Sequence, residues 1–315
     1  MSVTNQQKWL STMQSLSNMH DEIAMLLAGK KIAYIDIPVH FNVGDLLIYL
    51  GSEAFFEKNN LNVVYRSEVQ KTSFSHLKNV DAIVFHGGGN FGDLYDIHQK
   101  LREKIVSAFK DKLIICLPQT IYFSSENKLD ASVEIFSKHP NFYFFVRDKR
   151  SLELAQRFTS KASLMPDMAH SLHPLADVSE VGPTNATPQK KLSLVRRDIE
   201  SVSKTTGRNI QKNGFDWDDL ITVSDIAIFQ VYRILRIVKP NAAIKLWHKN
   251  TNDIFFKSCQ FFNQHDVIYT DRLHGLILSS LLGKQVMMYD NSYGKNFSYY
   301  DCWLKDNPFI IKCQS

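Results

Sequence analysis

The sequence of 315 residues is poor in cysteine and lacks any long apolar run. Its four cysteines show no C-x-x-C spacing, which argues against a zinc site and against a disulfide framework. No stretch reaches the roughly 18 apolar residues of a membrane-spanning helix, and the polar start Met1–Trp9 does not have the pattern of a signal peptide. We therefore expect a cytoplasmic protein that binds no metal ion.

The charge is only weakly biased to one sign. The chain has 37 basic and 32 acidic side chains, a formal net charge of +5, and these charges are spread rather than clustered. Such a balance favours an anionic ligand or surface but is too small to indicate nucleic acid. Length and an apolar content of 44% favour two α/β domains with substantial cores.

Predicted strands and helices alternate along the chain, which is typical of a parallel, doubly wound sheet. Residues 173–190 are rich in Pro, Ser, Thr and Ala without periodicity, and we interpret 176–190 as a linker. The linker would separate an N-terminal domain, 1–175, from a C-terminal domain, 191–300. The tail 301–315 is expected to pack back on the first domain.

The segment 80–96, VDAIVFHGGGNFGDLYD, contains a glycine run after a short apolar strand, Ala82–Phe85. We expect His86 and the three glycines behind it to form a tight turn before a helix over Asp93–Phe109. Glycine lets the backbone turn sharply and lets a ligand approach its amides, so this junction is a candidate anion site. The spacing differs from the G-x-G-x-x-G fingerprint of dinucleotide-binding domains.

Polar side chains recur where the predicted strands end, at the edge where ligands of such sheets bind. They are His40, Asp45, His86, Asp93, Gln119, Arg147 and Asp167. Asp45 follows a second strand–glycine–helix junction, Asn42-Val43-Gly44-Asp45, where its carboxylate either stabilises the helix start or binds a ligand.

The second half of the chain is predicted to contain a strand at Ala243–Trp247 and an amphipathic helix over 220–238. That helix carries Arg233, Arg236 and Lys239, which form either a solvated surface or a face for an anionic membrane. The polar segment 199–218 is interpreted as a mobile loop over a site.

Asp271-Arg272-Leu273-His274-Gly275 is the richest candidate site, because it lies between a short strand and an apolar helix. Arg272 and His274 would meet an anion at the positive end of that helix. A neutral imidazole in this place suits proton exchange near pH 7. Together with Arg147 and Lys295, Arg272 would supply the charge for a ligand bearing phosphate and carboxylate, provided that Arg147 faces the second domain.

The motifs HGGGNFGD, Val146-Arg147-Asp148 followed by Ser151, DRLHG and NVGD together resemble the polysaccharide pyruvyl transferase family, from about Lys31 to Lys295. The resemblance implies two Rossmann-like domains with an interdomain cleft, as in glycosyltransferase-B-like enzymes. It also implies phosphoenolpyruvate as donor, with no cofactor, and a sugar or lipid-linked oligosaccharide as acceptor. The product would be a pyruvylated glycan, and peripheral contact with a membrane is a further expectation.

The resemblance implies site residues at Arg147, Arg272, His274, Lys295 and Asp93, and we build a hypothesis for individual roles on it. His274 is the expected general acid and Asp93 the candidate base. The expected substrate-binding residues are Arg147, Arg272, Lys295, Leu273, His86, Gly87, Gly88, Gly89, Asn90 and Asp45.

Two rival functions remain open at this point. A nucleotide-sugar glycosyltransferase of the same architecture would need a ribose-binding carboxylate, for which Asp290 is available. A non-catalytic glycan- or nucleotide-binding protein is the other rival, although the intact Arg147, Arg272 and His274 argue against it. The sequence leaves the acceptor sugar, the product type (ketal or enol ether) and the oligomeric state undetermined.

Overall fold

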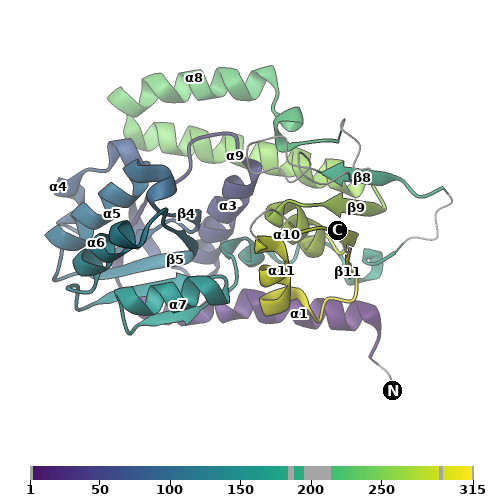
Figure 1. The fold of residues 1–315 in the computed structure, drawn as a ribbon. Helices are drawn as coiled ribbons and strands as arrows, with labels where there is room; N and C mark the ends of the chain where they lie inside the picture. Colours follow the sequence, from purple (N-terminus) through teal and green to yellow (C-terminus); the bar gives the residue numbers. More distant parts are fainter. Residues whose placement is uncertain (1–2, 184–187, 195–213, 291–293, 314–315) are drawn as a thin grey trace. The chain divides into compact units, whose positions relative to one another are not determined.

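The computed structural model describes residues 3–183, 188–194, 214–290 and 294–313. The contacts divide them into two compact units (Figure 1). The seven-stranded unit contains residues 19–39 and 51–171, and the four-stranded unit contains the described residues within 1–18, 40–50 and 172–315. The segment 40–50 therefore groups with the C-terminal half, whereas the sequence placed it inside an N-terminal domain, 1–175.

The seven-stranded unit is built on one parallel sheet. Its strands follow the order β2-β1-β3-β5-β6-β7, and β4 pairs with the outer part of β5. The strands are β1 (Lys31–Ile35), β2 (Asn62–Ser67), β3 (Ala82–Phe85), β4 (Gly88–Gly92), β5 (Leu113–Tyr122), β6 (Phe142–Val146) and β7 (Ala162–Leu164). Its helices are α2 (Asp21–Leu27), α4 (Phe74–Leu77), α5 (Asp96–Ala108), α6 (Glu126–Phe136) and α7 (Lys149–Phe158).

One face of this sheet forms the main hydrophobic core with α5, α6 and α7. Every second residue of the central strands contributes to it, as the two-residue period of a strand requires, for example Ile83 and Phe85 on β3. The other face is buried as well, and Tyr34 of β1 packs edge-on against Phe56 of α3 (Val43–Lys58). Burial on both faces explains why these strands read as continuous apolar runs.

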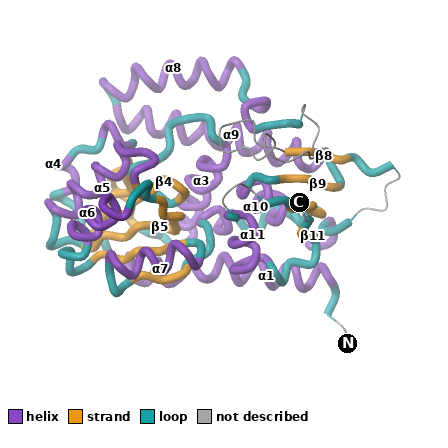
Figure 2. Tube along the Cα trace, viewed as in Figure 1, coloured by secondary structure: helices purple, strands orange, loops and turns teal. Residues whose placement is uncertain are grey.

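The four-stranded unit contains a second parallel sheet, in the order β11-β10-β9-β8. Figure 2 shows the strands of the chain in these two groups. The strands are β8 (Lys191–Leu194), β9 (Val267–Thr270), β10 (Gln285–Met288) and β11 (Ile310–Lys312). Its helices are α1 (Asn5–Met19), α8 (Val223–Val238), α9 (Pro240–Asn263), α10 (Leu273–Leu281) and α11 (Lys295–Tyr299), and the first half of α3 also belongs here.

Both ends of the described chain join this second unit. Trp9 of α1 is fully buried and donates its indole N–H to the carbonyl of Ser280 in α10, at 2.7 Å. The tail, expected to pack on the first domain, supplies β11, which pairs with β10.

The fold confirms a mixed α/β architecture with a seven-stranded parallel sheet, but two predicted elements differ. Ala243–Trp247 is not a strand; it lies inside α9, whose buried residues recur every three or four positions. Pro240 is accepted because it occupies the first turn of that helix. The predicted loop over 199–218 falls mostly outside the described residues.

The glycine run is the second difference, because it forms strand β4 rather than a bare turn. Gly92 has a φ of 122°, and a Cβ there would lie 1.7 Å from the carbonyl oxygen of Tyr122 in β5. Only glycine permits this pairing. The chain leaves β4 through a short 3-10 turn at Asp93–Tyr95, and α5 begins after that turn. The amides of the glycine run are therefore not at a helix N-terminus.

Candidate functional site

In the four-stranded unit, the DRLHG segment connects β9 to α10. Thr270 ends the strand and its hydroxyl accepts a hydrogen bond from the amide of Arg272, at 3.0 Å. Arg272 holds the N-cap position with an extended backbone, so Leu273 and His274 form the first turn of α10. The expected place of His274 at the start of a helix is therefore observed.

His274 lies directly against the backbone of Gly44, in the first turn of α3. A Cβ on Gly44 would lie 2.5 Å from Nδ1 and 3.0 Å from Cγ of the His274 ring. The start of α3 is fixed by Asn42, whose side-chain oxygen accepts a hydrogen bond from the Gly44 amide at 3.1 Å. The NVGD and DRLHG segments, 230 positions apart in numbering, thus meet within one unit.

Arg272 is held in place by a buried carboxylate that the sequence analysis missed. Its Nη2 donates to Oδ2 of Asp216 at 2.5 Å, and the side chains are 13% and 5% exposed. Asp216 also caps the short turn Trp217–Leu220. The only sequence signal was its capping pattern, D-W-D-D, beside a region without periodicity.

Gly275 has a packing role that explains the last position of DRLHG. A Cβ there would lie 2.5 Å from the Leu194 side chain and 2.6 Å from the Thr270 hydroxyl. Glycine therefore lets α10 approach β8 and β9 closely, which fixes the position of the first turn that carries His274.

The other predicted residues of this unit lie near helix starts. Asp45 is in the first turn of α3, with Oδ2 at 3.7 Å from Nε2 of His40. Lys295 is half-buried and opens α11, after the undescribed residues 291–293. Asp45, Arg272, Leu273, His274 and Lys295 all belong to the four-stranded unit.

In the seven-stranded unit, Arg147 follows β6 and is buried. Its Nη1 donates to Asp167 at 2.5 Å, and its Nε donates to the Thr120 hydroxyl at 2.9 Å. A Cβ on Gly89 would lie 3.3 Å from Nη2, so the glycine run leaves room for this guanidinium. Like Arg272, Arg147 is oriented in advance by a buried aspartate.

A buried network lies under β4 and contains residues that sequence reasoning did not identify. Asp36 follows β1 with a φ of 66° and accepts hydrogen bonds from Arg102 and His98, each at 2.5 Å. Burial raises the pKa of Asp36, but the Arg102 charge and the His98 hydrogen bond outweigh it and hold the pKa below its ordinary value. Such strain in a non-glycine residue is common near functional sites.

The same network anchors two of the predicted residues. Arg102 donates to the side chain and the carbonyl of Asn90, at 2.7 and 2.9 Å. His86 is buried, and its Nδ1 lies 2.6 Å from the hydroxyl of Tyr34. Gly87 and Gly88, between them, are buried too. These contacts give His86 and Asn90 structural roles in holding β4.

Asp93, the candidate base, is fully engaged in this structure. Its carboxylate accepts from the Ser124 amide at 2.8 Å, from the Ser124 hydroxyl, and from Lys128 at 2.8 Å. Burial raises the pKa of Asp93, but the hydrogen bonds from Lys128 and Ser124 outweigh this and lower the pKa. The carboxylate is thus ionised over the whole neutral range, which is the state that a proton acceptor requires.

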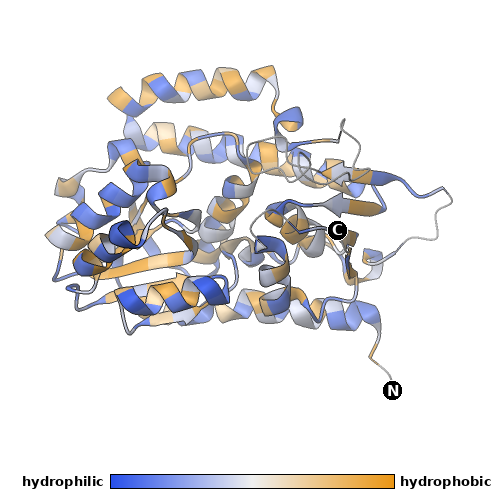
Figure 3. Cartoon of the chain, viewed as in Figure 1, coloured by the Kyte–Doolittle hydropathy of each residue, from blue (hydrophilic) through white to orange (hydrophobic). Residues whose placement is uncertain are grey.

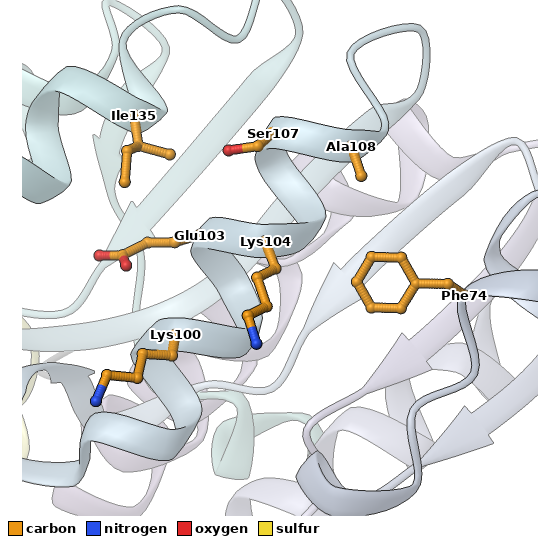
Figure 4. A pocket seen from close by; sticks show the side chains of 7 residues that line it. All are labelled: Phe74, Lys100, Glu103, Lys104, Ser107, Ala108 and Ile135. Atoms are coloured by element: carbon orange, nitrogen blue, oxygen red, sulfur yellow. The ribbon is translucent and has the colours of Figure 1, made fainter.

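A surface hollow of about 550 Å³ lies across the outer side of α5 in the same unit (Figure 4). Glu103 and Ser107 project from α5 toward Ile135, and Phe74 lies on the other side of the helix. None of the predicted site residues lines this hollow. Oε1 of Glu103 already accepts a hydrogen bond from the hydroxyl of Ser132, at 2.8 Å. We therefore locate the site at the strand ends instead.

Comparison with known proteins shows that the profile of one family covers all of these motifs. The profile of the polysaccharide pyruvyl transferase family matches residues 42–293. EpsO of Bacillus subtilis, which is assigned as a pyruvyl transferase, is 37% identical over 309 residues, covering 95% of this chain and 92% of EpsO. Pyruvyl transferase 1 of Schizosaccharomyces pombe is 29% identical, covering 87% of this chain and 70% of its own length.

One solved structure supports the fold alone. It is an uncharacterised protein of Klebsiella pneumoniae that is 22% identical, with a TM-score of 0.59 over 94% of this chain and 99% of that chain.

The range matched by the family profile, 42–293, begins at Asn42 and includes Gly44, Arg147, Arg272 and His274.

Proposed function

The chain belongs to the polysaccharide pyruvyl transferase family, and we propose that it moves the pyruvyl group of phosphoenolpyruvate onto a sugar of a cell-surface glycan precursor. It is a pyruvyl transferase of polysaccharide biosynthesis; the donor and the product are our proposal. The observation that carries it is the contact of Gly44 with His274, which joins two family motifs around a proton-exchanging side chain.

Donor binding is assigned to the oriented arginines. The Asp216 carboxylate fixes the plane of the Arg272 guanidinium, which can therefore bind phosphate or carboxylate oxygens with little loss of side-chain entropy. Lys295 adds a second cation in the same unit, and Arg147 stays a predicted donor-binding residue. Each arginine retains its partner, which spares it a large reorganisation on binding.

The reaction follows from the chemistry of the enol. His274 donates a proton to the methylene carbon, and an acceptor hydroxyl forms a C–O bond to the oxocarbenium-like C2. The C–O bond to phosphate then breaks, and a second hydroxyl of the sugar closes the ketal. Of the two hydroxyl protons, one replaces the proton given by His274 and the other leaves with phosphate. Asp93 is the proposed acceptor of a hydroxyl proton.

The architecture proposed for this reaction is a pair of Rossmann-like domains of glycosyltransferase-B-like type. What supports it is the parallel order of both sheets and the location of Arg147 and DRLHG just after strands β6 and β9.

Acceptor-dependent release of phosphate from phosphoenolpyruvate tests the function. Purified protein is incubated with the donor and a panel of free and lipid-linked oligosaccharides, and the product is analysed by mass spectrometry. We expect phosphate release only with a matching glycan, and a pyruvylated product. Consumption of a nucleotide sugar in place of phosphoenolpyruvate would show a glycosyltransferase instead.

Arg272→Lys provides the matched test of donor binding. Lysine keeps the charge but loses the planar fork, so we expect the KM for phosphoenolpyruvate to rise about tenfold to a hundredfold. The acceptor KM should change little, and an unchanged donor KM would remove Arg272 from the donor site.

The role of Asp93 is tested by Asp93→Asn, with Lys128→Gln as the control that retains the carboxylate. We expect the first variant to lose about 10²–10⁴-fold in kcat. In the second, loss of the Lys128 hydrogen bond lets the pKa of Asp93 rise toward its usual range. Activity needs the ionised base, so the acidic limb of the pH–rate profile should move to higher pH. An active Asp93→Asn protein would assign the contacts of Asp93 to structure alone.

A further inference from the structure

Helix α8 exposes an apolar face although it is firmly part of the four-stranded unit. Figure 1 shows it beside α9, and Figure 3 shows apolar residues along its whole length. Ile234 and Ile237 are 68% and 72% exposed. The other exposed aliphatic residues of the helix are Val223, Ile226, Val231 and Val238.

The opposite face of α8 makes the contacts that hold it. Tyr232 is buried and packs on Trp247 of α9, and Asp225 forms an ion pair with Lys257 of α9 at 2.6 Å. At about 100° per residue, the exposed aliphatic residues cover an arc of about 140° facing away from these contacts. Thr222 and Asp225 form a capping box, so the helix is well defined at its start.

The exposed charges within α8 and at its C-terminal end are basic, whereas exposed Asp218 and Asp219 precede the helix. From Val223 to Lys239, Asp225 is the one acidic residue, and it is buried against Lys257. Arg233 and Lys239 are exposed, and the following helix adds exposed Lys245. An apolar face bordered by basic side chains is complementary to an anionic surface with an apolar interior.

We propose that α8 docks in the plane of an anionic phospholipid bilayer and places its exposed isoleucines among the headgroups. The helix has 16 residues and is therefore about 24 Å long, less than the roughly 30 Å of a hydrocarbon core. Among the described residues, no helix is long and apolar enough to cross a membrane. A second copy of the chain is the alternative occupant of this face, and the oligomeric state distinguishes it from a bilayer.

Vesicle flotation tests this docking independently of the reaction. The probes are phosphatidylcholine vesicles with and without phosphatidylglycerol. Wild-type protein should float with the anionic vesicles and be released by high salt. The double variant Ile234→Glu/Ile237→Glu should bind at least about tenfold more weakly. The matched control is Met25→Glu, a 74% exposed apolar residue of α2, and it should float like the wild type.

A second variant, Arg233→Gln/Lys239→Gln, leaves the apolar face intact and should lose the preference for anionic vesicles. All three proteins should melt like the wild type, because every changed side chain is exposed. Wild-type protein that does not float, or a double glutamate variant that floats equally well, overturns the proposal. It is also overturned if sedimentation velocity shows a wild-type dimer that Ile234→Glu/Ile237→Glu converts to monomers.

Discussion

Replacing Gly44 by alanine should remove at least about 99% of transferase activity without unfolding the protein. The new Cβ would lie 2.5 Å from Nδ1 of His274, a distance at which one of the two groups has to move. A displacement of about 1 Å in a catalytic group can cost about 10²-fold in rate. Stability should hold, since alanine favours a helix more than glycine does. Steady-state kinetics and thermal melting measure the two effects.

A double-mutant cycle with His274→Ala tests whether Gly44→Ala acts through the imidazole of His274. If the alanine acts by moving the imidazole, it should cost little once the imidazole is gone, so the two losses will not add. Additive losses would show that Gly44 acts on catalysis by another route. A fully active Gly44→Ala protein would remove the basis for joining NVGD to DRLHG.

The local elements that sequence reasoning predicted well are those bounded by turn signals. Ala82–Phe85 is a strand with the expected bounds, because a short apolar run between polar residues leaves few alternatives. Ala243–Trp247 failed because its five residues are too short to show a period, and the buried spacing of α9 becomes clear only over all 24 residues.

The glycine run shows a second reason why a local pattern can fail to predict secondary structure. Three successive glycines are equally compatible with a turn and with a strand, since they have no side chains that would show alternation. What decides for β4 is its pairing with β5, which runs on to Tyr122. Strand pairing between segments some 30 residues apart is a tertiary property, and no local pattern contains it.

The position of a candidate site residue could be predicted where it depends only on neighbouring residues in the sequence. It could not be predicted where it depends on contacts between distant segments. DRLHG marks a strand–helix junction by itself, so the place of Arg272 and His274 followed from the sequence. Gly44 was visible only as part of a helix start, and its contact with His274 depends on how residues 40–50 fold with the C-terminal half. Asp36 had a weaker signal, as a polar residue directly after the apolar strand KIAYI.

Substituting His274 by glutamine should lower kcat by about 10²–10⁴-fold while the KM for phosphoenolpyruvate stays near the wild-type value. Glutamine retains a side-chain amide for hydrogen bonding but cannot deliver a proton at neutral pH. The split between the two parameters separates this role from that of Arg272, whose change should raise KM. Rapid-quench measurement of the first turnover would place the loss in the chemical step.

A matched control is His265→Gln in the same unit, where Nδ1 lies 2.9 Å from the carbonyl oxygen of Phe261 and no predicted site residue is involved. It should retain near wild-type turnover. A loss seen only in His274→Gln is then not a general effect of replacing a histidine in this unit. If His274→Gln instead turns over normally, the enol proton comes from another group, and the ring against Gly44 serves packing at the start of α10. The acid must then be sought among the remaining strand-end residues, since protonation of the methylene carbon is required for any ketal product.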